Sequence, residues 1–378
     1  MNFEEHAAKP LLGEVGIAVP KSGIAESAEA ARALAAEIGP VAVKAQVPTG
    51  KRGKAGGIKL TATPEEAAEA AEQILGMEIS GHPVASLLVE AQIKIAQELY
   101  AAVLTDTSSG QPLVIYSTKG GMDIEAVAAE EPNAVRRRAV DIAHGFSLDD
   151  ARAMVAEIGP EGAVEAVAQV LAALYALYRK RDAELVEINP LALTEDGQVI
   201  ALDCKFTLDD SALVRQQDIA DQGAPEVLSP LEARGHEHGL RYIELDGDIG
   251  ILANGAGVTM TTMDAVTYYG GRPANFLEIG GEAYTKAKPA LEIVLANPRV
   301  KSLVVNFCGA FARCDVMTEG VIQAWEALRP QIPVFFSIHG TGEVEAVSLV
   351  RERLKLEPFE TMDQAIQAAI AAAKEAAA

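Results

Sequence analysis

The sequence predicts two α/β domains, the N-terminal one with a mixed α+β arrangement. In the first half, short β-branched runs alternate with Ala- and Glu-rich stretches of helical periodicity. Beyond about residue 240, continuous apolar strands are separated by helical segments, the pattern of a parallel sheet with helices on both faces. Residues 216–239 are polar with scattered Gly and Pro, which favours a linker. We therefore predict one domain over residues 1–235 and a second over residues 236–378, each long enough to bury a core.

The first helix and strand of this pattern are marked by local signals. Residues 27–38 are expected to form a helix, with Ser27 as its N-cap and Gly39-Pro40 as its stop. Residues 41–47 follow as a strand on which Ala42, Lys44 and Gln46 share one face. A Gly-, Lys- and Arg-rich loop then leads to a returning strand.

Similar signals place other elements of the first domain. Thr63 caps a helix that has Pro64 at its first position. Asp196-Gly197 is a strong hairpin signal between LVEINPLAL and VIALDCK. The other elements are strands at 85–90, 98–105 and 112–117 and a long helix at 163–179.

Three apolar runs predict the parallel strands of the second domain. They are DIGILANGAG, VKSLVVNF and IPVFFSI, at residues 248–257, 300–307 and 332–338. An Ala-rich amphipathic helix is expected from about Met362 to the C-terminus.

Composition excludes several classes of protein. Lys and Arg total 32 against 54 Asp and Glu, for a net charge of -22. That field repels a polyanion, so we expect no nucleic-acid partner. Charges interrupt every apolar stretch before the roughly 20 residues of a membrane span, and the N-terminus lacks the pattern of a signal peptide. Three irregularly spaced cysteines do not make a disulfide framework, so a cytoplasmic location is expected, with Cys308 and Cys314 as small buried apolar side chains.

A basic loop is the first segment that predicts chemistry. Lys44 on its strand is followed by TGKRGKAGG at residues 49–57. Glycines let backbone N–H groups approach an anion, and the Lys and Arg side chains neutralise phosphate charge. The alternative is a solvated hairpin tip.

Hard oxygen ligands come from the predicted hairpin. Strand alternation places Glu187 and Asn189 on one face, and the hairpin brings Asp203 back toward Asn189. A carboxylate and an amide oxygen are the ligands that Mg²⁺ prefers beside nucleotide phosphates. The alternative is a buried polar pair that braces the hairpin.

Other polar positions are weaker candidates. Glu90 ends a strand, where it is expected either to bind a base or ribose or to be a surface acid. In the second domain, Gly-rich turns after buried strands expose N–H groups at helix N-termini, where a carboxylate or phosphate binds well. These turns follow Asn254 and Asn306.

Eight sequence blocks carry a resemblance to a known family. They are KAQVPTGKRGKAGG, LVEAQIKIAQELY, STKGGMDIEAVA, EINPLALTEDG, ALDCKFTLDDSALVR, LDGDIGILANGAGVTM, GGRPANFLEIGG and VKSLVVNFCGAFARCD. In this order they resemble the β-subunit family of succinyl-CoA synthetase (succinate–CoA ligase, ADP-forming) and its malate–CoA ligase relatives, from about residue 1 to 375. The resemblance implies an ATP-grasp domain followed by a flavodoxin-like CoA-ligase domain with a parallel sheet.

The resemblance also implies roles for individual residues. The implied nucleotide contacts are Lys44, Lys51, Arg52, Gly53, Glu90, Ile93 and Glu98. The implied Mg²⁺ ligands are Asn189 and Asp203, and Glu187 is implied to orient a phosphorylated histidine. The implied contacts to the acid substrate are Asn254, Ala310, Phe311 and Ala312.

Four of these positions depart from the family pattern. Lys51 stands where the family usually has Gly, and Ile93 replaces a commonly polar residue near the nucleotide. Ala310 replaces a glycine, where a Cβ costs roughly 1 kcal/mol or more if the position needs positive φ or close approach. Phe311 is bulkier than the usual residue, so the two changes are expected to bear on the choice of acid.

The resemblance implies a reaction and a partner. In this family ATP phosphorylates a histidine, the phosphoryl group passes to a carboxylic acid, and CoA displaces the acyl phosphate. The resemblance places the phosphohistidine and most of the CoA site on a separate α subunit, and none of the six histidines here lies in the Gly-His-Ala-Gly segment typical of that subunit. We expect an αβ or α₂β₂ acid–thiol ligase of the tricarboxylic acid cycle that uses ATP or GTP, Mg²⁺ and a small acid, most simply succinate.

Three alternatives stay open. The altered 309–312 segment favours a CoA ligase for malate or a related small acid. A ligase that joins a carboxylate to an amine is also compatible with an ATP-grasp domain, but the second domain argues against it. A nucleotide-binding regulatory subunit without turnover is the third, and the presence of Lys44, Glu187, Asn189 and Asp203 argues against it.

Overall fold

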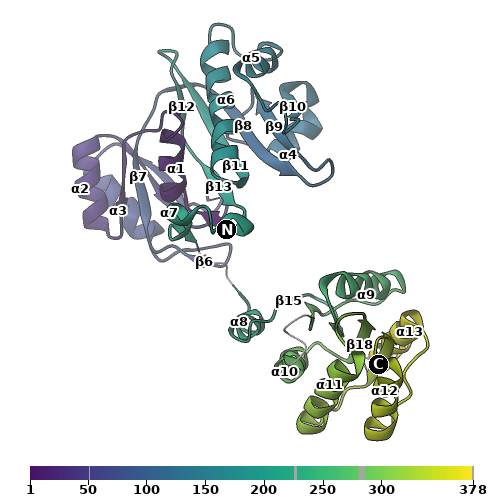
Figure 1. Ribbon diagram of the computed structural model, residues 1–378. Coiled ribbons are helices and arrows are strands. Elements are labelled where there is room, and N and C mark those ends of the chain that lie inside the picture. Colours follow the sequence, from purple (N-terminus) through teal and green to yellow (C-terminus); the bar gives the residue numbers. More distant parts are fainter. Residues whose placement is uncertain (51, 225–227, 281–285, 377–378) are drawn as a thin grey trace. The chain divides into compact units, whose positions relative to one another are not determined.

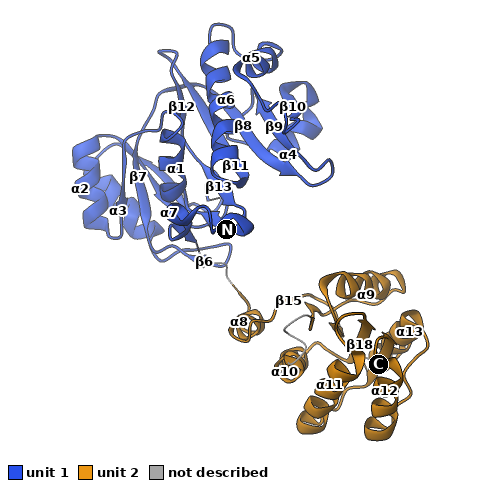
Figure 2. Ribbon diagram, in the orientation of Figure 1, with its two compact units in different colours: residues 1–226 blue, residues 227–378 orange. Residues whose placement is uncertain are grey.

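The computed structural model describes residues 1–50, 52–224, 228–280 and 286–376. The chain divides into two compact units, residues 1–226 and residues 227–378 (Figure 2). Over the described ranges, no helix is both long and apolar enough to cross a membrane.

Two antiparallel sheets organise the first unit (Figure 1). The large sheet has the strand order β10-β9-β8-β11-β13-β1-β14, and β12 pairs with β11. Its strands are β1 (Asn2–Phe3), β8 (Ile95–Asp106), β9 (Gln111–Ser117), β10 (Val135–Ala139), β11 (Ala183–Thr194), β12 (Val199–Ala201), β13 (Lys205–Leu208) and β14 (Gly223–Ala224). The small sheet has the order β2-β7-β3-β4, and a short ribbon pairs β5 with β6. Those strands are β2 (Ser22–Ala25), β3 (Val41–Ala45), β4 (Ile58–Thr61), β5 (Glu78–Ile79), β6 (His82–Pro83) and β7 (Leu87–Ala91).

Helices cover these sheets and create three cores in the first unit. Apolar residues of α1 (Glu5–Gly13), α5 (Leu148–Ala156) and α6 (Val164–Lys180) pack on one face of the large sheet. The short helix α4 (Ile124–Glu130) packs on the other face, against Tyr100, Ala102 and Ile115. Helices α2 (Ala28–Ile38) and α3 (Pro64–Ile74) cover the small sheet.

Local signals placed the starts of α2 and α3 correctly, whereas no helix was predicted at α1, α4 or α5. The Ser27 hydroxyl accepts a hydrogen bond from the N–H of Ala30, and the Thr63 hydroxyl accepts one from the N–H of Glu66. Gly39 ends α2 with φ of 102°, a backbone conformation that glycine adopts at low cost. The predicted hairpin is confirmed by the pairing of β11 with β12.

The second unit contains a parallel sheet with helices on both faces, as predicted. Its order is β16-β18-β19, with β16 at Ile249–Ala253, β18 at Ser302–Gly309 and β19 at Val334–Gly340. Helices α10 (Ala287–Ala296), α11 (Cys314–Leu328) and α12 (Glu343–Leu349) pack on one face. Helices α9 (Ala256–Tyr268) and α13 (Met362–Glu375) pack on the other. Strands β15 (Tyr242–Glu244) and β17 (Asn275–Leu277) form a separate ribbon.

The linker predicted over residues 216–239 is wrong for its helical parts. Helix α7 (Gln217–Ala220) lies in the first unit, and α8 (Pro230–Glu237) lies in the second. Ser229 and Glu232 form a capping box at the start of α8. Leu231 packs against the core of the second unit, so α8 belongs to that unit although it is polar.

Candidate functional site

Six charged side chains of the first unit form a cluster, called here the ion cluster. Its members are Glu5 and Lys9 of α1, Lys44 of β3, Arg52 of the basic loop, Glu90 of β7 and Asp203 just before β13. Five of them are buried, and only the Asp203 side chain keeps a third of its surface exposed. The structure thus brings together Lys44, Arg52, Glu90 and Asp203, four of the residues predicted to bind nucleotide or Mg²⁺.

Lys44 lies at the centre of the cluster. Its Nζ donates to Glu90 Oε1 at 2.6 Å, to Glu5 Oε1 at 3.0 Å and to the carbonyl oxygen of Leu202 at 2.6 Å. Because Glu90 pairs with both Lys44 and Lys9 and is 2% exposed, the alternative of a surface acid at this position is wrong.

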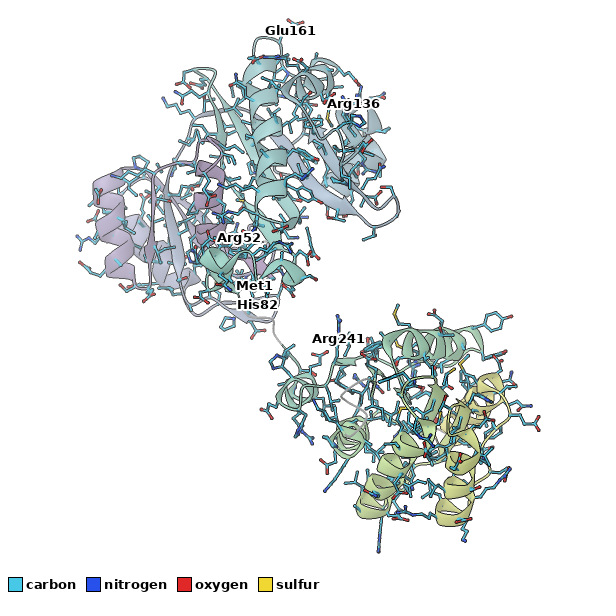
Figure 3. All side chains as sticks on the ribbon, in the orientation of Figure 1. Met1, Arg52, His82, Arg136, Glu161 and Arg241 are labelled. Carbon is cyan, nitrogen blue, oxygen red and sulfur yellow. The ribbon has the colours of Figure 1, made fainter. Side chains whose placement is uncertain are left out.

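Arg52 connects the basic loop to the hairpin. Its Nη2 donates to Asp203 Oδ1 at 2.7 Å, and its Nη1 donates to the carbonyl oxygen of Ala45 at 3.1 Å. Arg52 is 7% exposed and lies inside the first unit (Figure 3). The alternative of a solvated hairpin tip is therefore wrong for Arg52, although Gly53 beside it is exposed.

The charges of the cluster shift one another's protonation. Burial alone would raise the pKa of Glu5, but Lys44, Lys9 and Arg52 outweigh burial and hold that pKa well below its usual range. Burial alone would lower the pKa of Lys44, but Glu5 and Glu90 hold it above its ordinary value. Both residues therefore stay charged at neutral pH.

We expect Glu5 to make the first unit acid-sensitive. A carboxylate with a lower pKa in the folded chain stabilises the fold above its unfolded pKa, and this stabilisation is lost as the pH falls toward the folded value. The free energy of unfolding of the wild type should exceed that of Glu5→Gln at pH 7, and the difference should shrink as the pH falls below 4.5. Urea unfolding between pH 7 and 3 measures this difference. Glu72→Gln, on the exposed face of α3, is the control, and a difference independent of pH would contradict the prediction.

A second group of polar residues lies on the face of the large sheet that carries Tyr100. The Tyr100 hydroxyl donates to Glu187 Oε2 at 2.9 Å, and Glu187 pairs across the strands with Lys205. Burial raises the pKa of Glu187, and Asp203 adds to the rise, while Tyr100 and Lys205 partly offset it. Glu187 and Ile188 point to opposite faces as predicted, because Ile188 belongs to the core on the other side.

Asn189 and Glu98 meet at a turn between β9 and α4. The N–H of Gly121 donates to Asn189 Oδ1 at 2.7 Å, and Asn189 Nδ2 donates to the carbonyl oxygen of Met122 at 2.9 Å. Gly121 has φ of 70°, and a Cβ built there would stand 2.2 Å from Glu98 Oε2. Glycine at this turn lets the Glu98 carboxylate and the Asn189 amide approach the same backbone.

The predicted Mg²⁺ ligands fit a magnesium ion. The register Leu191 to Ala201, with the N–H of Leu202 donating to the carbonyl oxygen of Pro190, places Asn189 opposite Asp203. Asp203 Oδ2 accepts no hydrogen bond from the described residues, and Asn189 Oδ1 accepts one. No three His, Cys, Asp or Glu side chains converge on a metal position within the described chain. Two protein oxygens with open lone pairs suit Mg²⁺, which takes its other ligands from phosphate and water.

Two other predicted nucleotide residues stand apart from these contacts. Ile93 is half-buried in the connection between β7 and β8, and Gly53 is exposed in the basic loop. Lys51 lies outside the described residues.

In the second unit, the Asn254 amide joins two strand ends. Its Nδ2 donates to the carbonyl oxygen of Cys308 at 3.0 Å, and its Oδ1 accepts from the N–H of Cys308 at 2.7 Å. Both polar groups of Asn254 thus hold the carboxyl ends of β16 and β18 together. A ligand at this position would meet the side chain already oriented.

The segment after β18 presents the other predicted acid-binding residues. Ala310 is exposed, Phe311 is 99% exposed and Ala312 is half-buried. Ala310 does not have a positive φ, so the cost expected for alanine at a positive-φ position does not arise there. Cys308 is exposed, so its predicted burial is wrong too, whereas Cys314 is buried as predicted.

Sequence reasoning missed Glu5, Lys9, Tyr100 and Gly121. The signal for Glu5 and Lys9 was present: they are four residues apart on a helix and flanked by Ala8, Leu11 and Leu12, so two charges share the apolar side. No comparable local signal marks Tyr100, because its hydroxyl contacts Glu187 on a neighbouring strand that is 87 positions away in the sequence.

Comparison with known proteins matches both units. A family model described as ATP-grasp domain matches residues 2–193, and one described as CoA-ligase matches residues 252–375. The chain is 44% identical over 352 residues to the succinate–CoA ligase [GDP-forming] subunit beta of Thermus thermophilus, with 93% of each chain covered. It is 43% identical over 381 residues to the succinate–CoA ligase [ADP-forming] subunit beta of Haloarcula marismortui, with 99% of each chain covered.

A solved structure shares the fold. The ATP citrate lyase from Methanothrix soehngenii, in complex with citrate and coenzyme A, matches with a TM-score of 0.70. The match covers 98% of this chain and 99% of that chain at 22% sequence identity. At that identity the likeness concerns the fold alone.

Proposed function

The chain belongs to the succinate–CoA ligase β-subunit family, and we propose that it forms succinyl-CoA from succinate and CoA with an α subunit and a nucleoside triphosphate. Membership confirms the predicted fold of an ATP-grasp domain followed by a CoA-ligase domain. It also confirms an enzyme subunit that uses a nucleoside triphosphate.

The contact between Arg52 and Asp203 carries the proposal for the nucleotide site. It joins the basic loop, suited to phosphate, to a side chain suited to Mg²⁺, at 2.7 Å. The nucleotide phosphates bind against Lys44 and Arg52, which in the nucleotide-free chain pair with carboxylates of the ion cluster. Glu90, Ile93 and Glu98 contact the rest of the nucleotide. When bound beside Asn189 and Asp203, Mg²⁺ neutralises phosphate oxygens.

Glu187 serves the phosphoryl transfer. Its carboxylate accepts a hydrogen bond from the Tyr100 hydroxyl and lies close enough to Asp203 for the Asp203 charge to raise the pKa of Glu187. In that position it orients the imidazole of the α subunit as the histidine receives the γ-phosphoryl group. The phosphoryl group then passes to a succinate carboxylate, and the CoA thiol displaces phosphate from succinyl phosphate.

The acid is held by the second unit. Asn254 and residues 310–312 are its contacts, with CoA bound mainly by the α subunit. The complete exposure of Phe311 in the isolated chain supports a position that substrate or partner covers.

Co-purification with the α subunit tests the proposal. ATP- and Mg²⁺-dependent labelling of an α-subunit histidine and formation of acyl-CoA should be measured with ATP and GTP. The acids are succinate, malate, citrate, itaconate and acetate. Activity with succinate is expected. Activity only with another acid would contradict succinate as the substrate and point to residues 309–312 as the source of the different specificity. Labelling of the α subunit without acyl-CoA from any acid would contradict the proposal that the chain belongs to a functional ligase.

Alanine at Gly121 should weaken nucleotide binding. In Gly121→Ala, the left-handed backbone costs about 1 kcal/mol of stability. The added Cβ also displaces the Glu98 carboxylate, which weakens its contact with the nucleotide. Gly110→Ala is the matched control, because Gly110 has φ of 68° and open space around its Cβ. Both variants should lose similar stability in thermal unfolding, while only Gly121→Ala should bind ATP more weakly in calorimetry. Equal ATP affinity would contradict a role for Glu98.

A further inference from the structure

The ion cluster joins the two cores that flank it in the first unit. Helix α1 contributes Ala8, Leu11 and Leu12 to the core beneath the large sheet. The strands of Lys44 and Glu90 contribute Val43 and Val89 to the core of the small sheet. The contacts of Lys44 with Glu5 and with the carbonyl oxygen of Leu202 therefore cross from one core to the other.

Glu5 is the member of the cluster that contacts all three cations. Its carboxylate oxygens lie 2.6 Å from Lys9 Nζ, 3.0 Å from Lys44 Nζ and 2.7 Å from Arg52 Nη1. Three cations meet three carboxylates within the cluster, so its formal charges balance. Glu5 thus places a buried anion between the two cations assigned to the phosphates.

Lys44 has no donor to spare for a phosphate. An ammonium group has three N–H donors, and those of Lys44 are directed at Glu5, Glu90 and the Leu202 carbonyl oxygen. A phosphate oxygen can bind Lys44 only if one of these contacts opens. Opening the contact with Glu5 frees Lys44 and Arg52 together, because both pair with that carboxylate.

Two details favour Glu5 as the group that yields. Arg52 Nη1 lies 2.7 Å from Glu5 Oε2, and Arg52 also donates to the carbonyl oxygen of Ala45 and to Asp203, so it keeps two partners when Glu5 leaves. Lys9, one turn along the same helix, keeps its own contact with Glu5. Glu5 can therefore lose Lys44 and Arg52 and still have a paired charge.

We propose that Glu5 is a positioning residue that acts as an internal counter-anion: it holds Lys44 and Arg52 in the nucleotide-free chain, and the nucleotide phosphates take its place while Lys9 retains it. This inference rests on the proposed nucleotide site. It assigns Glu5 and Lys9 opposite effects on anion binding, because Glu5 competes with the phosphate for Lys44 and Arg52 whereas Lys9 holds Glu5 away from them.

Calorimetry on the full chain tests the signs, with ATP and with inorganic tripolyphosphate as a probe that lacks the base. Glu5→Gln should bind tripolyphosphate roughly tenfold more tightly than the wild type, because a competing charge is gone. Lys9→Gln should bind it more weakly by a similar factor, because Glu5 and Glu90 then rely on Lys44 and Arg52. Glu14→Gln is the matched control: it removes one ion-paired carboxylate from the end of the same helix, where Glu14 pairs with Lys180 and Arg181.

If Glu5 and Lys9 only stabilised the fold, the two variants would not change phosphate binding in opposite directions. Both substitutions disturb the same buried cluster, so damage to the fold would weaken binding in both. Weaker binding by Glu5→Gln, or binding equal to that of Glu14→Gln, would overturn the proposal. With the α subunit present, Glu5→Gln should lower the KM for ATP and lower kcat, because Lys44 binds phosphate but is no longer held in place.

Two further outcomes have defined meanings. Circular dichroism and urea unfolding establish that the variants fold; if Glu5→Gln does not, Glu5→Asp withdraws the carboxylate from Lys44 and Arg52 and should tighten binding by a smaller factor. A wild-type chain that binds neither ATP nor tripolyphosphate would overturn the proposed nucleotide site. A wild-type chain that binds both, with the two variants changed in the same direction, would overturn only the role of Glu5.

Discussion

Replacing Lys44 by methionine is expected to abolish nucleotide-dependent phosphoryl transfer and to destabilise the first unit by about 3 kcal/mol. Methionine keeps the length of the side chain but removes its charge. Glu5 and Glu90, both buried, then share Lys9 and Arg52 as their remaining cations. The carbonyl oxygen of Leu202 loses one of its two donors as well.

Urea unfolding measures the loss of stability, and labelling of the α subunit measures phosphoryl transfer. Lys21→Met is the matched control, because Lys21 also pairs with a glutamate, Glu37, at 2.7 Å, with both side chains mostly exposed. A surface pair of this kind contributes little to stability because water screens both charges, so the control should keep wild-type stability and activity. Equal stability of the two variants would mean that the ion cluster does not hold the unit together.

Replacing Glu187 by glutamine should lower kcat by roughly 10²–10³-fold without loss of stability. The Tyr100 hydroxyl still has an oxygen to donate to, so the local geometry survives. The sign of the stability change follows from the pKa of Glu187, which burial raises. Above its unfolded pKa the charged carboxylate is less favourable in the fold than in the unfolded chain, so glutamine at pH 7 removes a cost.

This variant separates chemistry from nucleotide binding. We expect Glu187→Gln to bind ATP with wild-type affinity but to label the α-subunit histidine slowly. Glu184→Gln, on the same strand and exposed, is the control and should behave as the wild type. Labelling at the wild-type rate by Glu187→Gln would remove the proposed role of this carboxylate, whatever its effect on stability.

The sequence predicted the elements whose causes lie within a few residues. Ser27 and Thr63 cap helices because their hydroxyls reach an N–H three residues away. Asp196-Gly197 closes the β11–β12 hairpin because glycine accepts the positive φ of the turn. Helices α1, α4, α5 and α8 were not predicted, and α8 was concealed by its polar composition although its capping box at Ser229 is a local signal.

Exposure of single residues was harder to predict. Cys308 and Cys314 have the same chemistry and lie six positions apart, yet one is exposed and the other is buried. Burial depends on which helix covers the end of a strand, and no pattern within the segment reports it. The φ of Ala310 was equally hard to predict: it is not positive, so the part of the expected strain that depends on a left-handed backbone is absent.

The sequence by itself determined the helices that Ser27 and Thr63 cap, the β11–β12 hairpin and the parallel sheet of the second unit, and it predicted which residues suit phosphate and Mg²⁺. Only the tertiary structure decided that Lys44, Arg52, Glu90 and Asp203 share their charges with Glu5 and Lys9. These ion pairs join residues 39, 46 and 151 positions apart. Caps and turns are local interactions, whereas a buried charge must find its partner wherever the fold brings one close.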